Sequence, residues 1–411
     1  MRLSEPFYRR KLTQCQAALT DHELDGLLLL NPANIYYLIG FFHFPTERIV
    51  AAWIPRSGEP ALFIPRLEED HAASSWVRSR QVYFEHLGPP HPINWIGDRL
   101  TKWGYGEGNI GYEGGVGIRT LERLQAAMPQ ASWTDEGGKI VAQLRQVKDG
   151  EEIALLRKAA EFSDAMLEAG AQAVRERGLI SEIEINQIVT RSVVREMIAS
   201  LDEIVDVGGL AGGLVCAGPR AAYPHGLPSL ARPKPGDCLI LSFGCSVGGY
   251  HAESERTFFI GEPSKEHRAY YEAMLRAQQT GVAALWPSNE CRTANKVCLD
   301  VLREAGYEMY IKHRMGHGLG LEGHEPPWIE DGDDTPLRAG MVVSAEPGLY
   351  VPGFGGYRVS DTVLVTRDGP ESLTQYPRDL QSMILEVRPP KPGEPKPPST
   401  KRKPRSQPVR R

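Results

Sequence analysis

The pattern of the chain after residue 148 constrains its fold more than any other feature. Two helices come first, because Asp149 with Glu152 and Ser181 with Glu184 match the capping-box signature of a helix start. Paired helices beside long antiparallel strands predict an α+β domain whose sheet carries the functional site. The strands are expected in the β-rich, glycine-punctuated segments that follow, at residues 203–218, 237–243, 249–260, 341–349 and 357–366.

A smaller unit precedes this domain. Within residues 1–146, short apolar segments typical of strands alternate with stretches of helical spacing. Segments 48–55 and 61–65 are expected to be two strands joined by the turn-forming sequence P-R-S-G-E-P. We therefore predict an α/β domain at residues 1–146 and the larger domain at residues 147–388.

The end of the chain differs from both domains in composition. Residues 388–411 contain nine Lys or Arg, eight Pro and one Glu. Such a segment cannot bury a core, so residues 389–411 are predicted to form a disordered basic tail. A basic tail can bind nucleic acid, but the whole chain carries a net charge of −5, so the rest of it is acidic and repels phosphate. We expect a solubilising extension and no nucleic-acid partner.

Composition also indicates a location. No apolar run reaches the roughly 18 residues that a membrane span needs, so no membrane contact is expected. The first residues are polar and do not resemble a signal peptide. The six cysteines are scattered without a C-x-x-C pair, which is typical of free thiols. These features predict a cytoplasmic protein.

Several short motifs follow one another along the chain. The segment N-P-A-N-I-Y-Y-L-I-G-F at 31–41 is similar to the N-terminal domain of creatinase and aminopeptidase P. The motifs of the larger domain are A-A-Y-P-H at 221–225, L-I-L-S-F-G at 239–244, G-G-Y-H-A-E-S-E-R-T at 248–257, H-R-M-G-H-G-L-G at 313–320, H-E-P-P at 324–327, E-P-G-L-Y at 346–350 and R-V-S-D at 358–361. With these motifs in order, the chain up to about Arg388 resembles the pita-bread family of creatinase, prolidase, aminopeptidase P and methionine aminopeptidase. The resemblance implies a pita-bread α+β domain behind a smaller creatinase-type α/β domain.

The metallopeptidases of this family hold a pair of metal ions with two Asp, one His and two Glu. On this chain those positions fall on Ser242, Glu253, His317, Glu346 and Ser360. Two neighbouring divalent ions repel each other and need bridging carboxylates, and a serine hydroxyl is a poor ligand. We therefore expect no metal pair and no other cofactor. A single ion on Glu253, His317 and Glu346 stays open as an alternative.

One segment is closer to metal-independent relatives. Creatinase carries A-x-E-R-T where the metallopeptidases carry D-x-T-R-T, and E-S-E-R-T at 253–257 places Glu255 at the creatinase position. Ectoine hydrolase is similar there. The resemblance implies a metal-independent hydrolase of a non-peptide C–N bond, of amidine or guanidine type, in a small zwitterionic molecule. The alternatives are a metal-dependent Xaa-Pro aminopeptidase or dipeptidase with a degenerate metal site, and a non-catalytic binding protein.

Three residues are predicted to be catalytic. His225 lies in a Pro-His-Gly loop, and an imidazole can carry a proton to a leaving nitrogen. A loop His that caps a backbone carbonyl is the alternative. Glu255 and Glu346 are expected on neighbouring strands, where paired carboxylates can clamp a cation or attack as a nucleophile. The alternative for these two is an internal salt bridge to Arg256 or Arg358.

Four further residues are predicted to line the substrate pocket. Glu253 shares a strand face with Glu255, because the two are separated by one residue. His317 lies between two glycines, which permit close approach, and His324 faces the pocket in relatives. His251 stands where creatinase has Tyr, which argues against creatine itself as the substrate.

Arg48, in the N-terminal domain, is predicted to bind the substrate carboxylate. In creatinase an aligned Arg reaches into the pocket of the partner subunit. The resemblance therefore implies a homodimer in which each pocket is completed by the other chain. A surface Arg paired with Glu47 is the alternative.

Overall fold

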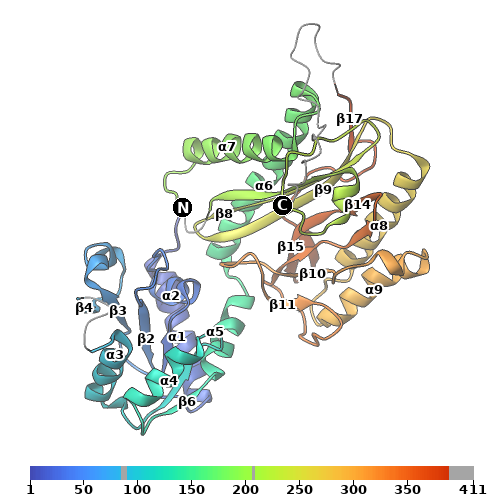
Figure 1. The fold of residues 1–411 in the computed structure, drawn as a ribbon. Coiled ribbons are helices and arrows are strands. Elements are labelled where there is room, and N and C mark those ends of the chain that lie inside the picture. Colours follow the sequence, from blue (N-terminus) through green and yellow to red (C-terminus); the bar gives the residue numbers. More distant parts are fainter. Residues whose placement is uncertain (85–89, 206–208, 388–411) are drawn as a thin grey trace, which may run out of the picture.

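Two β-sheets with their helices make up the part of the chain that the computed structural model describes, residues 1–84, 90–205 and 209–387. One sheet belongs to an N-terminal body and the other to a C-terminal body, and the two bodies lie next to each other (Figure 1). The predicted basic tail at residues 389–411 lies outside the described residues.

The N-terminal body is a six-stranded sheet with the order β4-β3-β2-β1-β5-β6. Strand β2 pairs antiparallel with both neighbours, and the other pairs are parallel. Its strands are β1 (Gly26–Leu29), β2 (Ala51–Pro55), β3 (Ala61–Pro65), β4 (Ser79–Tyr83), β5 (Asn109–Tyr112) and β6 (Ser132–Thr134). Its helices are α1 (Glu5–Asp21), α2 (Pro32–Ile39), α3 (Pro92–Leu100), α4 (Ile118–Ala127) and α5 (Glu136–Gln146).

Both faces of this sheet are buried. Leu28 of β1 packs in one core with apolar residues of α3 and α4, while Leu27 and Leu29 pack in another with those of α1 and α2. Successive side chains of a strand point to opposite faces, so an apolar strand of this kind needs a helix layer on each side. The strands predicted at 48–55 and 61–65 are confirmed as β2 and β3.

The C-terminal body is a nine-stranded sheet. Its strands follow the path β11-β10-β12-β15-β9-β8-β7, with β16 on β15 and β17 on β9. They are β7 (Ala211–Ala217), β8 (Cys238–Val247), β9 (Tyr250–Ile260), β10 (Gly316–Gly318), β11 (Glu325–Ile329), β12 (Val342–Ala345), β15 (Ser360–Thr366), β16 (Gly369–Ser372) and β17 (Ile384–Leu385). A separate antiparallel pair is β13 (Gly348–Val351) and β14 (Gly355–Arg358), and the helices are α6 (Gly150–Arg177), α7 (Glu182–Ser200), α8 (Lys265–Ala283) and α9 (Cys291–Glu304).

Both predicted capping boxes are present. The Asp149 side chain accepts hydrogen bonds from the first turn of α6, and the Glu152 carboxylate accepts one from the Asp149 amide. The same reciprocal bonds occur at the start of α7. Of the β-rich segment expected at 203–218, residues 206–208 lie outside the described residues, and β7 covers Ala211–Ala217 before a 3₁₀ turn begins.

Buried charges join the two bodies. Nζ of Lys11, on α1, lies 2.9 Å from the Glu152 carboxylate of α6, and the Tyr250 hydroxyl donates to the same carboxylate at 2.9 Å. The Arg145 guanidinium, on α5, contacts Glu325 at the start of β11, whose other oxygen lies 2.9 Å from Nζ of Lys148. These groups are removed from water, so they fix one body against the other only while each charge keeps its partner.

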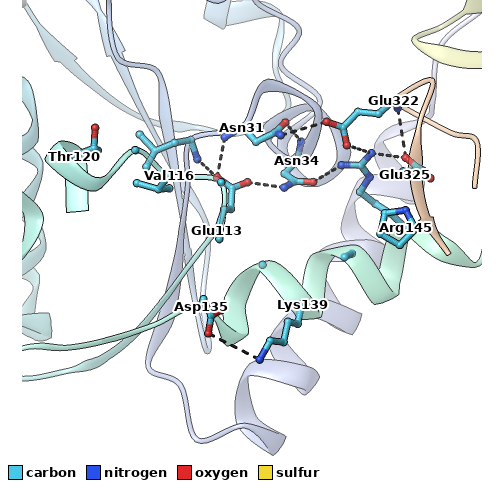
Figure 2. Close-up of a pocket in the computed structure, with 17 residues that line it drawn as sticks. Asn31, Asn34, Glu113, Val116, Thr120, Asp135, Lys139, Arg145, Glu322 and Glu325 are labelled. Atoms are coloured by element: carbon cyan, nitrogen blue, oxygen red, sulfur yellow. Dashed lines mark hydrogen bonds and ion pairs between the residues drawn. The ribbon is translucent and has the colours of Figure 1, made fainter. Parts of the chain in front are cut away.

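A second group of polar side chains borders a cavity between the bodies (Figure 2). The Arg145 guanidinium contacts Glu325, lies 2.8 Å from Glu322 and donates to Asn34 at 2.7 Å. Asn34 donates in turn to Glu113 at 2.6 Å. The cavity measures about 540 Å³ and receives side chains from both bodies.

None of the helices in the described ranges has the length and apolar character that crossing a bilayer requires. All six cysteines are buried free thiols.

Candidate active site

Strand β9 supplies one wall of the site. Its residues His251, Glu253 and Glu255 alternate with buried small residues and so share one face of the sheet. The neighbouring strands place a serine on each side of Glu255, because Ser242 of β8 and Ser360 of β15 both pair with it in register. Ser242 and Ser360, the serines at the family's metal-ligand positions, therefore lie on either side of Glu255.

His317 and Glu346 face this wall from β10 and from the turn between β12 and β13. His317 Nε2 lies 3.1 Å from Glu346 Oε1. Glu253, His317 and Glu346 each offer one ligand atom, and these atoms all lie within 4.8 Å of one another. The structure thus brings together three of the predicted site residues.

The serine hydroxyls bind the carboxylates. The Ser242 hydroxyl donates to Glu255 Oε1 in a short hydrogen bond, and the Ser360 hydroxyl donates to Glu253 Oε1 at 2.9 Å. The other oxygen of Glu255 lies 2.7 Å from Nε of Arg358. Glu255 is thereby held at both oxygens, which confirms the internal salt bridge to Arg358 that the sequence left open.

Burial and mutual charge perturb the site's acid groups. Burial, with Glu346 and Glu255 nearby, raises the pKa of Glu253 to about 8. Burial lowers the pKa of His317, but Glu346 and Glu253 outweigh it and raise that pKa to about 9. Burial also disfavours the Glu346 carboxylate, but His317 and Arg358 outweigh it and lower its pKa to about 2.

The donor set fits one divalent metal ion. His317 Nδ1 donates to the Gly318 carbonyl at 3.1 Å, which leaves Nε2 as the nitrogen available to a metal. Nε2 is buried and faces Glu346 Oε1 at 3.1 Å, so both atoms point to the place that an ion would take. An imidazole and two carboxylates are the ligands of many three-residue metal sites with an open position. A metal pair does not fit, because the remaining positions are serines and Glu255 is bound to Arg358.

The predicted histidines occupy different parts of the site. The His324 ring lies against the His317 ring, with centroids 3.9 Å apart. His225 is exposed in the loop after β7, and the carbonyl of the preceding Pro224 accepts from Nη1 of Arg358 at 3.3 Å, which places this loop at the rim of the site. His251 lies at the other end of the β9 row, toward Glu325, and burial lowers its pKa. The catalytic role of His225 stays a prediction.

Arg48 lies in the N-terminal body before β2. Its Nη1 is 2.5 Å from the carboxylate of Glu47, and the side chain is about one third exposed. This pairing is the alternative that the sequence left open. A role of Arg48 in the pocket of a second chain stays a prediction.

The interpretation of the sequence underestimated the residues that surround Glu255. The Tyr350 hydroxyl accepts from Nη1 of Arg358 at 3.4 Å and lies 2.8 Å from His313 Nε2. His313 Nδ1 lies 2.8 Å from the Arg314 carbonyl. The signal that could have identified Arg358 is its position two residues before Ser360, which places both on one side of the chain.

An N-terminal α/β body and a C-terminal sheet with a carboxylate–imidazole cluster on its face define a pita-bread hydrolase. Residues 154–367 match the model of metallopeptidase family M24, and residues 11–147 match that of the creatinase/prolidase N-terminal domain. The chain belongs to metallopeptidase family M24.

Its relatives carry peptidase names. It is 32% identical over 383 residues to an Xaa-Pro dipeptidase of Lactobacillus delbrueckii subsp. lactis, covering 92% of this chain and 99% of that protein. A dipeptidase PepE structure from Mycobacterium ulcerans is 30% identical with a TM-score of 0.82, over 94% of this chain and 100% of that one. A prolidase structure from Pyrococcus horikoshii is 26% identical with a TM-score of 0.77, over 90% and 99%.

These comparisons confirm part of the sequence interpretation and correct the rest. The family, the two-part pita-bread fold and the hydrolase class are confirmed. The interpretation as a metal-independent, creatinase-like hydrolase of a non-peptide C–N bond is wrong, and the nearer likeness to creatinase and ectoine hydrolase is not supported, because the relatives are named Xaa-Pro dipeptidases and prolidases. The structure gives a physical reason: Glu255, on which that interpretation rested, is bound by Ser242 and Arg358.

Proposed function

We propose that this protein hydrolyses small dipeptides of the Xaa-Pro type with the help of one divalent metal ion. The observation that carries the proposal is the convergence of ligand atoms from Glu253, His317 and Glu346 within 4.8 Å. The names of relatives that cover almost the whole chain support the substrate class.

In this proposal Glu253, His317 and Glu346 hold the ion, which supplies Lewis-acid chemistry when bound. Groups of the protein orient the ligand side chain and transfer the proton. The Gly318 carbonyl fixes the orientation of the His317 ring. Cleavage of an Xaa-Pro bond releases the ring nitrogen of proline, which must gain a proton, and we assign that transfer to His225 at the rim.

We further propose the assembly and the location. A dipeptide ends in a carboxylate, and a guanidinium can bind it through two parallel hydrogen bonds. Arg48 of a second chain is the candidate, so the active form is a homodimer. The buried free thiols are typical of a reducing compartment, so we assign the protein to the cytoplasm.

The test measures proline release from Ala-Pro and Leu-Pro by protein freed of metal with a chelator and then supplied with Mn²⁺, Co²⁺ or Zn²⁺. We expect hydrolysis only after an ion is added, with Ala-Ala and creatine as control substrates. The His317→Ala variant should be inactive with every ion. The His71→Ala variant removes an imidazole on the N-terminal body and should match the wild type. Absence of Xaa-Pro cleavage with all three ions would overturn the proposal.

A further inference from the structure

We infer that the cavity between the two bodies is a second small-molecule site, which binds a free α-amino acid with an apolar side chain. This site is separate from the one in the proposed function, because none of the residues that line the cavity is a proposed metal ligand. The place of the cavity in the fold and the charges on its wall both indicate a ligand site (Figure 2).

The cavity lies at the carboxyl edge of the parallel strands β1, β5 and β6. Its wall includes residues that directly follow these strands, namely Leu30 after β1, Glu113 after β5 and Asp135 after β6. Helix α2, which follows β1, packs in one core, and helix α4, which follows β5, packs in the other core on the opposite face of the sheet. In open α/β sheets such a change of face marks the crevice in which ligands bind.

The size and the apolar part of the wall suit a small molecule. The volume of about 540 Å³ lies within the range of roughly 300–1,000 Å³ that is typical of ligand pockets. Leu30, Val116, Ala142 and Pro326 offer apolar contacts. Pro326 belongs to the C-terminal body and the other three to the N-terminal body, so a ligand in the cavity would contact both.

Glu113 is a buried charge without a counter-ion. It is 5% exposed, and its carboxylate accepts from three neutral donors: the amides of Leu30 and Asn31, at 2.5 and 2.8 Å, and the side chain of Asn34, at 2.6 Å. The other charged side chains of the wall have ion-pair partners; they are Asp135, Lys139, Arg145, Glu322 and Glu325. Three donors leave one of about four acceptor positions of the carboxylate open. Because buried charges are normally paired, we expect Glu113 to bind the ammonium group of a ligand.

The segment that follows Glu113 offers donors to an anion. The amides of Gly114 and Gly115 have no hydrogen-bond acceptor among the described residues. A Cβ on either glycine would meet nothing within 4 Å, so the space beside them is open. Helix α4 begins at Ile118 without a side-chain cap, and the positive end of its dipole adds to the attraction for a carboxylate.

The positions for a cation and an anion lie side by side, because Gly114 and Gly115 directly follow Glu113 in the chain. An α-amino acid carries its ammonium and its carboxylate on one carbon and so can reach both positions at once. A dipeptide separates the two charges by a peptide unit and matches them less well. Free amino acids are also the products of the proposed reaction, and only that link rests on the proposed function.

A series of ligands tests the charges without any variant. Metal-free wild-type protein is titrated in a calorimeter with L-leucine, N-acetyl-L-leucine, L-leucinamide and Leu-Pro. We expect one leucine per chain. N-acetylleucine lacks the ammonium and leucinamide lacks the carboxylate, so each should bind at least about 10-fold more weakly. No saturable binding of leucine up to about 10 mM, or equal binding of either analogue or of Leu-Pro, would overturn the inference.

Variants test the location. Glu113→Gln removes the charge and Gly115→Leu fills the open space, so each should weaken leucine binding at least about 10-fold. Gly150→Leu is the control, because a Cβ there also meets nothing within 4 Å and the residue lies away from the cavity wall. His317→Ala disables the proposed metal site and should bind leucine like the wild type.

Loss of leucine binding in His317→Ala, with normal binding in a folded Glu113→Gln or Gly115→Leu protein, would place the amino acid in the active site and overturn the inference. Either cavity variant decides if the other does not fold. Xaa-Pro hydrolysis is measured separately, so failure of the inference leaves the proposed function standing.

Discussion

At the scale of single residues, the site contains carboxylates of two kinds. Glu253 and Glu346 each turn a ligand atom toward His317, within 4.8 Å. Glu255 instead has its oxygens occupied by a serine hydroxyl and by Arg358. A Glu→Gln substitution should therefore affect metal binding at Glu253 or Glu346, and protein stability at Glu255.

Glu346→Gln removes a metal ligand and should lower the affinity for Zn²⁺ or Mn²⁺ by more than about 100-fold, above the range typical of an outer partner. Glu255→Gln should keep the ion and lose stability, since Arg358 is left without its charge partner. Elemental analysis and the thermal midpoint separate the two outcomes. Glu322→Gln, on the interdomain cavity, is the control that should retain the ion. Loss of metal in Glu255→Gln and not in Glu346→Gln would reverse the assignment.

The lowered pKa of Glu325 predicts how the stability of the protein depends on pH. Burial disfavours its charged form, but Lys148 and Arg145 outweigh burial and hold its pKa below the ordinary value. The stabilisation is therefore fully present above the unfolded pKa of about 4.3 and is lost as the pH falls through the lower folded pKa. In urea unfolding at pH 7, Glu325→Gln should be destabilised by about 3–5 kcal/mol, with a weaker loss on acidification.

The matched control for Glu325 is Glu371, whose ion pair with Arg157 is about half exposed. Glu371→Gln should change the free energy of unfolding by less than about 1 kcal/mol, because exposed pairs are screened by water. An equal effect of the two substitutions would contradict the role given to burial.

At the scale of elements, strand β10 needs its glycines to bring His317 into the site. A Cβ on Gly316 would lie 2.1 Å from the Ser344 carbonyl oxygen of β12. Gly316→Ala should therefore push the two strands apart and destabilise the protein by about 1–3 kcal/mol. It should also weaken metal binding, because the next residue is a ligand.

The control for this change is Gly323→Ala, in the loop between β10 and β11, where a Cβ meets nothing within 4 Å. Urea unfolding and metal titration on both variants provide the measurement. If Gly316→Ala and Gly323→Ala behave alike, packing at β10 does not set the position of His317.

Local signals predicted the helices well. Asp149 and Ser181 marked the starts of α6 and α7, because a capping box is complete within four residues of sequence. Strand β7 begins at Ala211, inside the segment expected at 203–218, because the glycines around residues 208–213 give no signal that marks where a strand starts. The division between domains at residues 146 and 147 stays our proposal.

The site was predicted only in part. Motif order identified His317, Glu253 and Glu346 as a group, and the structure places them together. The partner of Glu255 could not be chosen from sequence, because Arg256 and Arg358 were both plausible. In the structure Arg256 forms an ion pair with Asp361 and Arg358 forms one with Glu255. Both pairs depend on the pairing of strands that lie more than a hundred residues apart in the sequence.

At the scale of the whole molecule, we expect a homodimer in which Arg48 completes the pocket of the partner chain. Sedimentation should give twice the mass of one chain. Arg48→Ala and Glu346→Gln should each inactivate the protein, and a mixture of exchanged subunits should recover part of the activity, since one pocket per mixed dimer is intact. Arg56→Ala, a surface pair with Asp25, should have no effect. A monomer, or an exchanged mixture as inactive as its parents, would refute the shared pocket.

The buried charges between the two bodies have a consequence for modularity. A fragment that began at Val147 would lack Lys11 and Arg145, cations that Glu152 and Glu325 face in the intact chain. Its newly exposed surface would carry unpaired acid groups beside apolar side chains that had been covered. The C-terminal body is therefore not a module that can be isolated or transferred to another protein. An N-terminal domain from a relative could replace the native one only if it carried the same two cations.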